Sequence, residues 1–89
     1  MLTRALSPFG KVEKYEHRDG IITRHKGRFS SDKISLSKIH AWSVYYEMGM
    51  DVVRIEFTND EEVRWIDKYN DLLGILRKFV LGKETVFKQ

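Results

Sequence analysis

The sequence predicts an α+β fold that is mostly β, with about six antiparallel strands followed by one C-terminal amphipathic helix. Three observations predict it. Apolar and polar residues alternate over much of the chain up to residue 67, turn-forming residues separate these stretches, and a helical apolar period occurs only near the C-terminus. Strands followed by a helix, without repeated strand-helix alternation, favour an antiparallel sheet.

One domain is expected for the 89-residue chain, covering residues 1–89. Within it we expect a lead-in arm over 1–10, an antiparallel sheet over 11–67, a helix over 68–81 and a frayed tail over 82–89. The chain contains no cysteine, which excludes disulfides and thiolate metal sites. No stretch approaches the ~20 apolar residues of a membrane span. The N-terminus also lacks the apolar run of a signal peptide, so we expect a cytoplasmic protein.

The first predicted element is a β-hairpin over Lys11–Lys26. Its turn is Asp19-Gly20, a typical hairpin pair, and the β-favouring residues Ile21, Ile22 and Thr23 follow directly. A second turn is predicted at Ser30-Ser31-Asp32. The N-terminal third of the chain is therefore expected to be hairpin structure.

A break in the alternation marks the centre of the chain. Ile34 and Leu36 alternate with polar residues, and the period then slips by one before Ile39. A bulge or a single helical turn between Leu36 and Ile39 would return Ile39 to the core. An even-numbered apolar stripe follows, which indicates a strand and a turn near Gly49; its members are Trp42, Val44, Tyr46, Met48 and Met50.

The next two strands, over Asp51–Thr58 and Glu61–Asp67, alternate most clearly. A two-residue loop between them would place charged side chains opposite apolar ones. We therefore expect a three-residue loop over 59–61. The apolar pairs in this register are Phe57 with Val63 and Ile55 with Trp65.

The last element is predicted to be an amphipathic helix. Asp67 is a suitable N-cap, Gly82 a suitable C-terminal stop, and Gly74 indicates close packing on the sheet. The apolar residues recur at helical spacing, namely Tyr69, Leu72, Leu73, Leu76, Phe79 and Val80.

Charge is distributed unevenly along the chain. Residues 1–40 contain nine Lys and Arg against four Asp and Glu, whereas residues 41–89 contain seven against nine. A basic region of this kind can attract an anionic partner. The alternative is that these charged strand positions are simply solvated. The candidate ligand-contacting residues are Arg24, Lys26, Arg28 and Lys33.

The run Gly20–Ile39, with its I-x-L-x-x-I step at Ile34, Leu36 and Ile39, resembles small bacterial pleckstrin-homology-like (PH-like) domains. The resemblance covers roughly Lys11–Leu81. It implies a partly open, orthogonally packed β-barrel capped by the C-terminal helix, and no enzyme activity. Eukaryotic relatives often bind phosphoinositide headgroups or peptides, and some bacterial ones are thought to self-associate.

The lipid-binding motif of that superfamily places a Lys in the first strand and a basic-x-Arg in the second. By this resemblance Lys14 matches the first position. Either Arg24-His25-Lys26 or Lys26-Gly27-Arg28 corresponds to the second, and only the latter ends in Arg.

The sequence contains no recognisable catalytic, metal or cofactor motif. No glycine-rich phosphate loop is present, and the serines near His40 do not lie in a nucleophile elbow. Glu61-Glu62 belongs to an expected exposed turn, which supplies no cleft for acid-base chemistry. The three histidines lack metal-ligand spacing; they are His17, His25 and His40. We therefore expect no catalytic residue, no metal and no cofactor.

These observations leave three functional hypotheses. The first is a non-enzymatic binding or self-assembly module, in which a sheet edge and exposed Met48 and Met50 contact a protein partner or form a homo-oligomer. The alternative is nucleic-acid binding through the basic strand region 24–33, with Tyr45 as the one clearly outward aromatic, because Trp42, Tyr46, Phe57 and Trp65 fall on inward positions. The third is attachment to anionic lipid headgroups, worth about 1 kcal/mol per basic residue near the surface.

Overall fold

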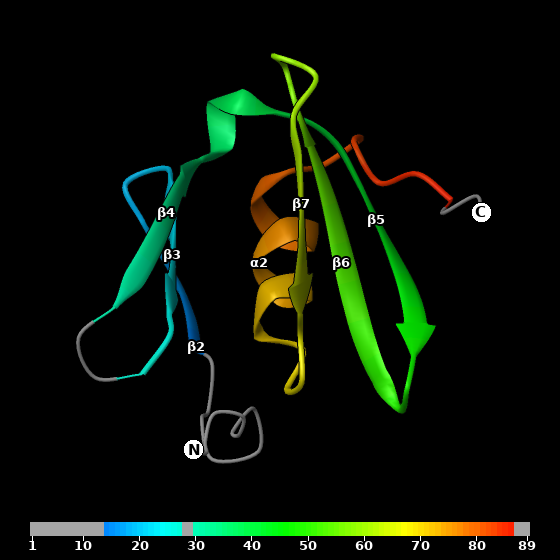
Figure 1. Cartoon of the computed structure of the whole chain (residues 1–89). Helices are drawn as coiled ribbons and strands as arrows, with labels where there is room; N and C mark the ends of the chain where they lie inside the picture. The colour runs from blue at the N-terminus through cyan, green and yellow to red at the C-terminus, as the bar shows by residue number, and fades with distance from the viewer. Residues whose placement is uncertain (1–13, 28–29, 87–89) are drawn as a thin grey trace.

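The computed structural model describes residues 14–27 and 30–86, which form two three-stranded antiparallel sheets and one C-terminal α-helix (Figure 1). The first sheet has the order β2 (Lys14–Arg18), β3 (Ile21–His25) and β4 (Ser31–Ser35). The second has the order β5 (Ile39–Glu47), β6 (Met50–Phe57) and β7 (Glu62–Ile66). A single 3₁₀ turn, η1 (Leu36–Lys38), connects the sheets, and α2 (Asp71–Phe79) follows β7. The prediction of a mostly β chain with a C-terminal helix is confirmed.

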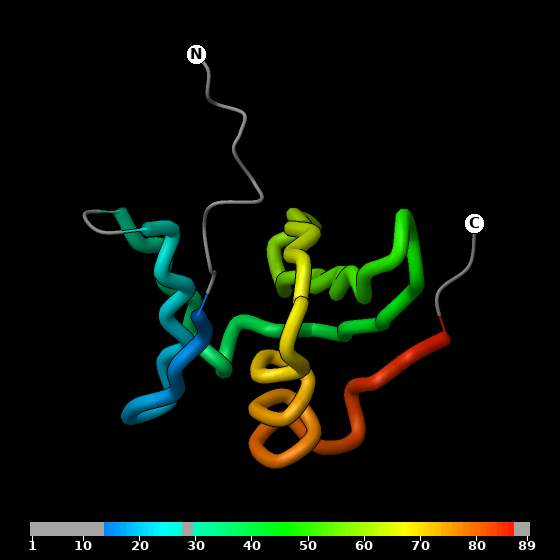
Figure 2. Tube along the Cα trace, turned by 90° about the horizontal axis from the view of Figure 1, so that it is seen from below, coloured from blue at the N-terminus to red at the C-terminus, as the bar shows by residue number. Residues whose placement is uncertain are grey.

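Helix α2 lies between the two sheets and packs against the inner faces of both. In Figure 1 it stands behind β7, and the view from below in Figure 2 shows the β2–β4 sheet on one side of it and the β5–β6 hairpin on the other. All three units therefore supply the core, whose buried side chains are Tyr15, Ile22, Ile39, Trp42, Val53, Ile55, Trp65, Leu72, Leu73, Leu76 and Val80.

The β2–β3 hairpin forms at the predicted Asp19-Gly20 turn. Both residues have positive φ, 52° for Asp19 and 77° for Gly20, as a tight two-residue hairpin turn requires. The second predicted turn is wrong, because Ser31 and Asp32 already belong to β4. The strands join earlier, where the Lys26 N–H donates to the Ser30 carbonyl at 2.9 Å.

Two structural features accommodate the break in the alternation of apolar and polar residues before Ile39. Turn η1 supplies the single helical turn that the sequence predicts, and the register of β5 against β6 shifts between Ile39 and Ala41. Ile39 is completely buried as a result. The Thr58 N–H donates to the Lys38 carbonyl at 2.9 Å and holds this turn against the β6–β7 connection.

The strands described do not close into the expected barrel, and the single sheet expected over 11–67 is divided. The cause is η1, which separates β4 from β5 so that no strand of one sheet pairs with a strand of the other within the described ranges. Side chains bridge the sheets instead. Tyr15 stacks on Trp65 with ring centroids 5.7 Å apart, and its hydroxyl donates to the Ile66 carbonyl at 2.6 Å.

The β6–β7 hairpin keeps the predicted faces but not the predicted pairs. In the observed register Ile55 pairs with Val63 and Val53 pairs with Trp65. This register is shifted by two residues along β6 from the expected register. The loop is Thr58-Asn59-Asp60, because the last loop residue must be left-handed and Asp60 adopts φ 70° there. A shift of two residues leaves the apolar side chains on one face, so the core is unaffected.

Helix α2 begins later than the predicted residue 68, although the predicted capping group is used. Asn70, immediately before the helix, has φ 63° and no side-chain cap. The buried carboxylate of Asp67 reaches forward and accepts hydrogen bonds from the N–H groups of Leu72 at 3.1 Å and Leu73 at 2.8 Å. Asp67 therefore performs the N-cap chemistry from outside the helix.

Two members of the predicted helical stripe are not in the core. Tyr69 precedes the helix and is exposed, and Phe79 at its last position is partly exposed and stacks on His17 with ring centroids 4.0 Å apart. The helix ends at Phe79 rather than at 81, and Gly82 beyond it has φ 77°. The remaining stripe residues are buried as predicted, namely Leu72, Leu73, Leu76 and Val80.

The segment after α2 pairs with β5 instead of fraying. The Trp42 N–H donates to the Lys83 carbonyl at 2.9 Å, and the Thr85 N–H donates to the Trp42 carbonyl at 2.7 Å. Glu84 thereby forms a parallel bridge with Trp42. Residues 87–89 of the expected tail and the expected arm over 1–10 lie outside the described residues.

Candidate interaction surfaces

The predicted basic surface begins at Arg24, whose side chain is only 19% exposed. Its guanidinium lies over the Trp65 ring, 5.1 Å from the centroid, and 3.8 Å from the Asp32 carboxylate. The ammonium of Lys26 approaches the same carboxylate at 3.1 Å. The structure therefore brings Arg24 and Lys26 together around an acidic residue that offsets part of their charge.

Lys33 lies on the opposite face of the same sheet. Arg24 pairs with Asp32 and Thr23 pairs with Lys33, and neighbouring residues of a strand point to opposite faces. Lys33 lines two open hollows, one of about 370 Å³ with Arg18 and one of about 390 Å³. Arg28, the remaining candidate, lies outside the described residues.

The lipid motif implied by the PH-like resemblance is also divided between faces. Lys14 pairs with His25, whereas Arg24 pairs with the buried Tyr15. Lys14 and His25 consequently share the outer face, and Arg24 is directed to the inner one. A single headgroup site that uses both Lys14 and Arg24 does not follow from this register.

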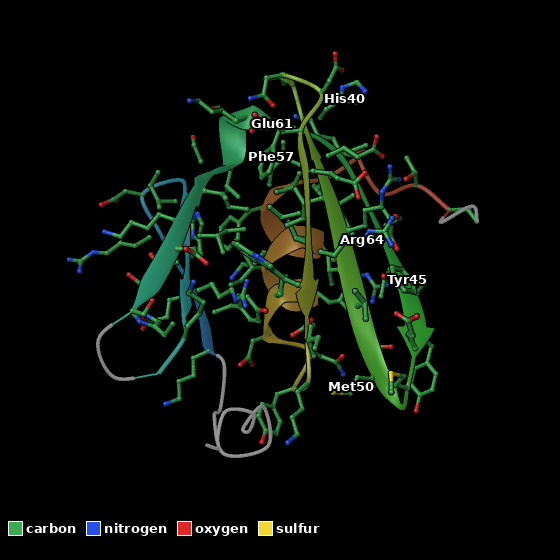
Figure 3. All side chains as sticks on the ribbon, viewed as in Figure 1. His40, Tyr45, Met50, Phe57, Glu61 and Arg64 are labelled. Atoms are coloured by element: carbon green, nitrogen blue, oxygen red, sulfur yellow. The ribbon has the colours of Figure 1, made fainter. Side chains whose placement is uncertain are left out.

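An ion-pair network covers the outer face of the second sheet, and the sequence interpretation missed it. Arg54 donates to Glu62 at 2.8 Å and to Glu56 at 3.2 Å, and Arg64 donates to Glu62 at 3.0 Å. The hydrogen bonds from Arg54 and Arg64 lower the pKa of Glu62. Figure 3 shows Tyr45 beside Arg64, which donates to the tyrosine hydroxyl at 3.3 Å. In the sequence, the charged residues that alternate along the two strands at positions 54, 56, 62 and 64 could have indicated this network.

Strand β5 changes its environment halfway along. Trp42 is 1% exposed, whereas Tyr46, on the same face four residues later, is 72% exposed and Met48 in the following turn is 90% exposed. The inward position predicted for Tyr46 is therefore wrong, while the predicted exposure of Met48 is confirmed. The region at the end of α2 contacts Trp42 through Val80 and Arg77, and the β5–β6 hairpin continues beyond these contacts. Figure 3 shows Met50 at this projecting end of the hairpin.

The exposed part of β5 also has an open backbone edge. Trp42 turns its N–H and C=O away from β6 toward Lys83 and Thr85. Because this orientation repeats every second residue, Val44 and Tyr46 direct their backbone groups to the same edge. No strand in the described ranges pairs with that edge beyond Trp42.

A hollow of about 440 Å³ lies beside Val44, between the hairpin and α2. Its floor includes Leu73 and Gly74 of the helix, and a Cβ added at Gly74 would meet no atom within 4 Å. Gly74 therefore leaves space open instead of allowing the close packing that the sequence suggested. Polar groups surround the hollow, namely those of Asp51, Asn70 and Arg77.

The titratable groups of the described residues do not converge on a reactive centre. His25 contacts Glu16 through Nε2 at 2.5 Å, and His17 stacks on Phe79. His40 is exposed at the start of β5, near Phe57 and Glu61 in Figure 3. Within 14–27 and 30–86 no group of three or more His, Asp or Glu side chains is arranged to hold a metal ion. Over the same ranges no helix is long and apolar enough to cross a membrane.

Compared with models of protein families, with curated protein sequences and with solved structures, the chain matches none. The function is therefore inferred from this chain's own surfaces. Two of them are candidates, the divided basic region of β3 and β4 and the exposed half of β5.

Proposed function

We propose that this protein is a non-enzymatic module of PH-like type that binds a protein partner or a second copy of itself through a sheet edge. The observation that carries the proposal is the second half of β5. There a strand edge that no other described strand pairs with lies next to two strongly exposed apolar side chains, Tyr46 and Met48. An open edge accepts a further strand by backbone hydrogen bonding, and tyrosine and methionine are enriched in protein interfaces.

The PH-like part of the proposal is supported by the order of elements. Three antiparallel strands, a single helical turn, a second set of three strands and a C-terminal helix follow one another. The helix packs between the sheets, and the I-x-L-x-x-I step lies at the junction, where Ile39 is buried. The resemblance of Gly20–Ile39 implies a strand and a Gly-containing turn, the I-x-L-x-x-I step, further hairpin strands and a closing helix, and these features occur here in that sequence.

The anionic-ligand alternative has weaker support from the geometry. Nucleic-acid or lipid binding through residues 24–33 would use Arg24, Lys26, Arg28 and Lys33 together. Arg24 and Lys26 are paired with Asp32, and Lys33 points to the other face. Nucleic-acid binding through this region stays a prediction.

Molar mass in solution, measured by light scattering at low and high salt, tests the proposal. We expect an oligomer at both salt concentrations, because strand pairing and apolar burial respond less to ionic strength than phosphate contacts do. A monomer at both salt concentrations would contradict self-assembly. Binding to a different protein would then be the only form of the proposal left. Binding assays with single-stranded nucleic acid and anionic liposomes would then decide about the alternative, with Lys26→Glu and Arg28→Glu as controls. Binding that these reversals abolish would favour an anionic ligand.

A further inference from the structure

We infer that the free edge of β4 binds an extended acidic segment of another protein, which adds to the first sheet as a further antiparallel strand. This site goes beyond the proposed function, because β4 and β5 lie on opposite sides of α2 (Figures 1 and 2). It follows from the backbone groups that β4 leaves open, from the charge on its outer face and from a hollow on its inner face.

The backbone groups of β4 alternate between β3 and the open edge. The Lys26 N–H donates to the Ser30 carbonyl at 2.9 Å. At the other end of the strand the Leu36 N–H donates to the Gly20 carbonyl, also at 2.9 Å. These two bonds fix the phase of the ladder, so the even-numbered residues of β4 bond to β3 and the odd-numbered residues turn away from it. The residues that turn away are Ser31, Lys33 and Ser35. Among the described strands none pairs with this edge (Figure 1).

The outer face beside this edge is cationic. Its exposed cations are Lys14, Arg18 and Lys33. No carboxylate of residues 14–27 and 30–86 forms an ion pair with any of them. Glu16 lies on the same face but contacts His25, and Asp19 lies in the turn at its end. Carboxylates on the outer face of an added strand would therefore meet unpaired cations, with Lys33 directly opposite.

The inner face beside the same edge is hollow. A space of about 390 Å³ lies between Ile34 of β4 and the β6–β7 connection, and Phe57 lines it. Both side chains are partly buried and pack against the core. Figure 3 shows Phe57 and Glu61 beside η1, which directly follows β4. An inward side chain of the added strand, opposite Ile34, enters this space, and an apolar group matches its floor.

The occupant is therefore a segment in which acidic and apolar residues alternate. A second copy of β4 does not meet this requirement, because its outer-face residues include no acid. They are Ser31, Lys33 and Ser35. An exposed lysine on an edge strand also opposes pairing with copies of the same chain, whereas it attracts an acidic strand. The antiparallel direction is the more stable one per residue.

A capped peptide in which Glu and Val alternate over the length of β4 is the probe. Titration calorimetry should show that it binds, and that the same peptide with Lys in place of Glu does not. Lys33→Glu should weaken binding about tenfold or more, because it replaces a directly opposite attraction with repulsion. Lys68→Glu is the matched charge reversal, at an exposed lysine after β7, and should change the dissociation constant less than about twofold. Equal effects of the two reversals would reduce the attraction to net charge and overturn the site.

Methylation of the peptide backbone tests strand addition separately from charge. In an antiparallel strand with Glu on the outer face, the Glu N–H groups face Lys33 and Ser35, whereas the Val N–H groups point away from β4. Methylating the Glu nitrogens should abolish binding, and methylating the Val nitrogens should weaken it far less. Equal losses with the two methylated peptides would overturn the antiparallel pairing.

Amide hydrogen exchange locates the bound peptide on the native chain. The N–H groups of Lys33 and Ser35 should exchange more slowly when the peptide is bound, and those of Val44 and Tyr46 on the β5 edge should not change. Slower exchange at Val44 and Tyr46 alone would overturn the β4 site and support the proposed function instead. A peptide that does not bind at about 1 mM also overturns the β4 site, and the molar mass of the native chain still tests the β5 edge.

Discussion

The two halves of β5 belong to one strand and have opposite surroundings. Residues 39–43 are in contact with β6 on one edge and the segment after α2 on the other, with the helix over the inner face. Residues 44–47 retain only β6 as a neighbouring strand among the described residues, and their exposure rises toward the turn. The sequence pattern continues from one half into the other, because Trp42, Val44 and Tyr46 form one stripe at even positions.

Alternation in the sequence therefore defines the face of a strand but not what covers that face. Trp42 and Tyr46 lie on one face, and only Trp42 has Val80 and Arg77 of the helix region beside it. The first half therefore supplies stability, and the second half supplies a surface. Substitutions along and around β5 should separate these two roles.

The largest effect is expected for Trp42→Ala. The ring is fully buried and its Nε1 donates to the Val80 carbonyl at 3.4 Å. Deleting a buried tryptophan side chain costs about 3–5 kcal/mol, a large part of the stability of a small domain. Urea unfolding followed by circular dichroism should show this loss. A loss below about 1 kcal/mol would mean that the first half of β5 does not anchor the core.

Asp67→Ala should destabilise the protein by about 1–3 kcal/mol, because the N–H groups of Leu72 and Leu73 lose their acceptor in a buried position. These residues begin the helix that bounds the hollow next to Val44. Asp71→Ala is the matched control, since Asp71 is exposed and in the first turn, and it should cost only a few tenths of a kcal/mol. Equal losses in the two variants, again from urea unfolding, would assign the effect to helix-end charge instead of to the hydrogen bonds.

Asp67 should also give stability a distinct pH dependence. Burial raises the pKa of this carboxyl, the bonds from Leu73 and Leu72 oppose that shift, and Asp71 and Asp51 add to it. The folded state therefore holds the proton more tightly than the unfolded state, in which the pKa is about 3.9. The contribution of Asp67 to stability is therefore complete below the pKa of the unfolded state. It is lost as pH rises through the pKa of the folded state.

The comparison of the native chain with Asp67→Asn isolates this effect. Other carboxyls, including Glu62 with its lowered pKa, titrate in both proteins and cancel in the difference. The free energy of unfolding of the native chain relative to Asp67→Asn should therefore fall as pH rises through the acid range. A relative stability that grows with pH would show that the ionised carboxylate is the favoured form in the fold.

Local chemistry determined what the sequence predicted correctly. The slip before Ile39, the Asp19-Gly20 turn and the capping carboxylate of Asp67 each depend on a few neighbouring residues. The faces of β6 and β7 also followed from alternation, although their register did not. That register depended on whether Asp60 or Glu61 takes the left-handed position.

Long-range pairing determined what the sequence did not predict. The separation of Lys33 from Arg24 requires the β3–β4 register, because runs of basic residues in sequence do not specify a common face. The bridge from Glu84 to Trp42 joins segments 42 residues apart, and no local pattern indicates it. The burial of Trp42 but not of Tyr46 depends on contacts from Arg77 and Val80, which belong to a distant part of the chain.

The smallest effect is expected for Tyr46→Ser in the unassociated protein. The side chain is mostly exposed, so its removal should change the free energy of unfolding by no more than about 0.5 kcal/mol. Urea unfolding at a protein concentration low enough to avoid association measures this value. The same substitution should strongly weaken association at high concentration, whereas Trp42→Ala should lower stability at every concentration. If Tyr46→Ser destabilises the unassociated chain as much as Trp42→Ala does, the second half of β5 belongs to the core and does not form a separate surface.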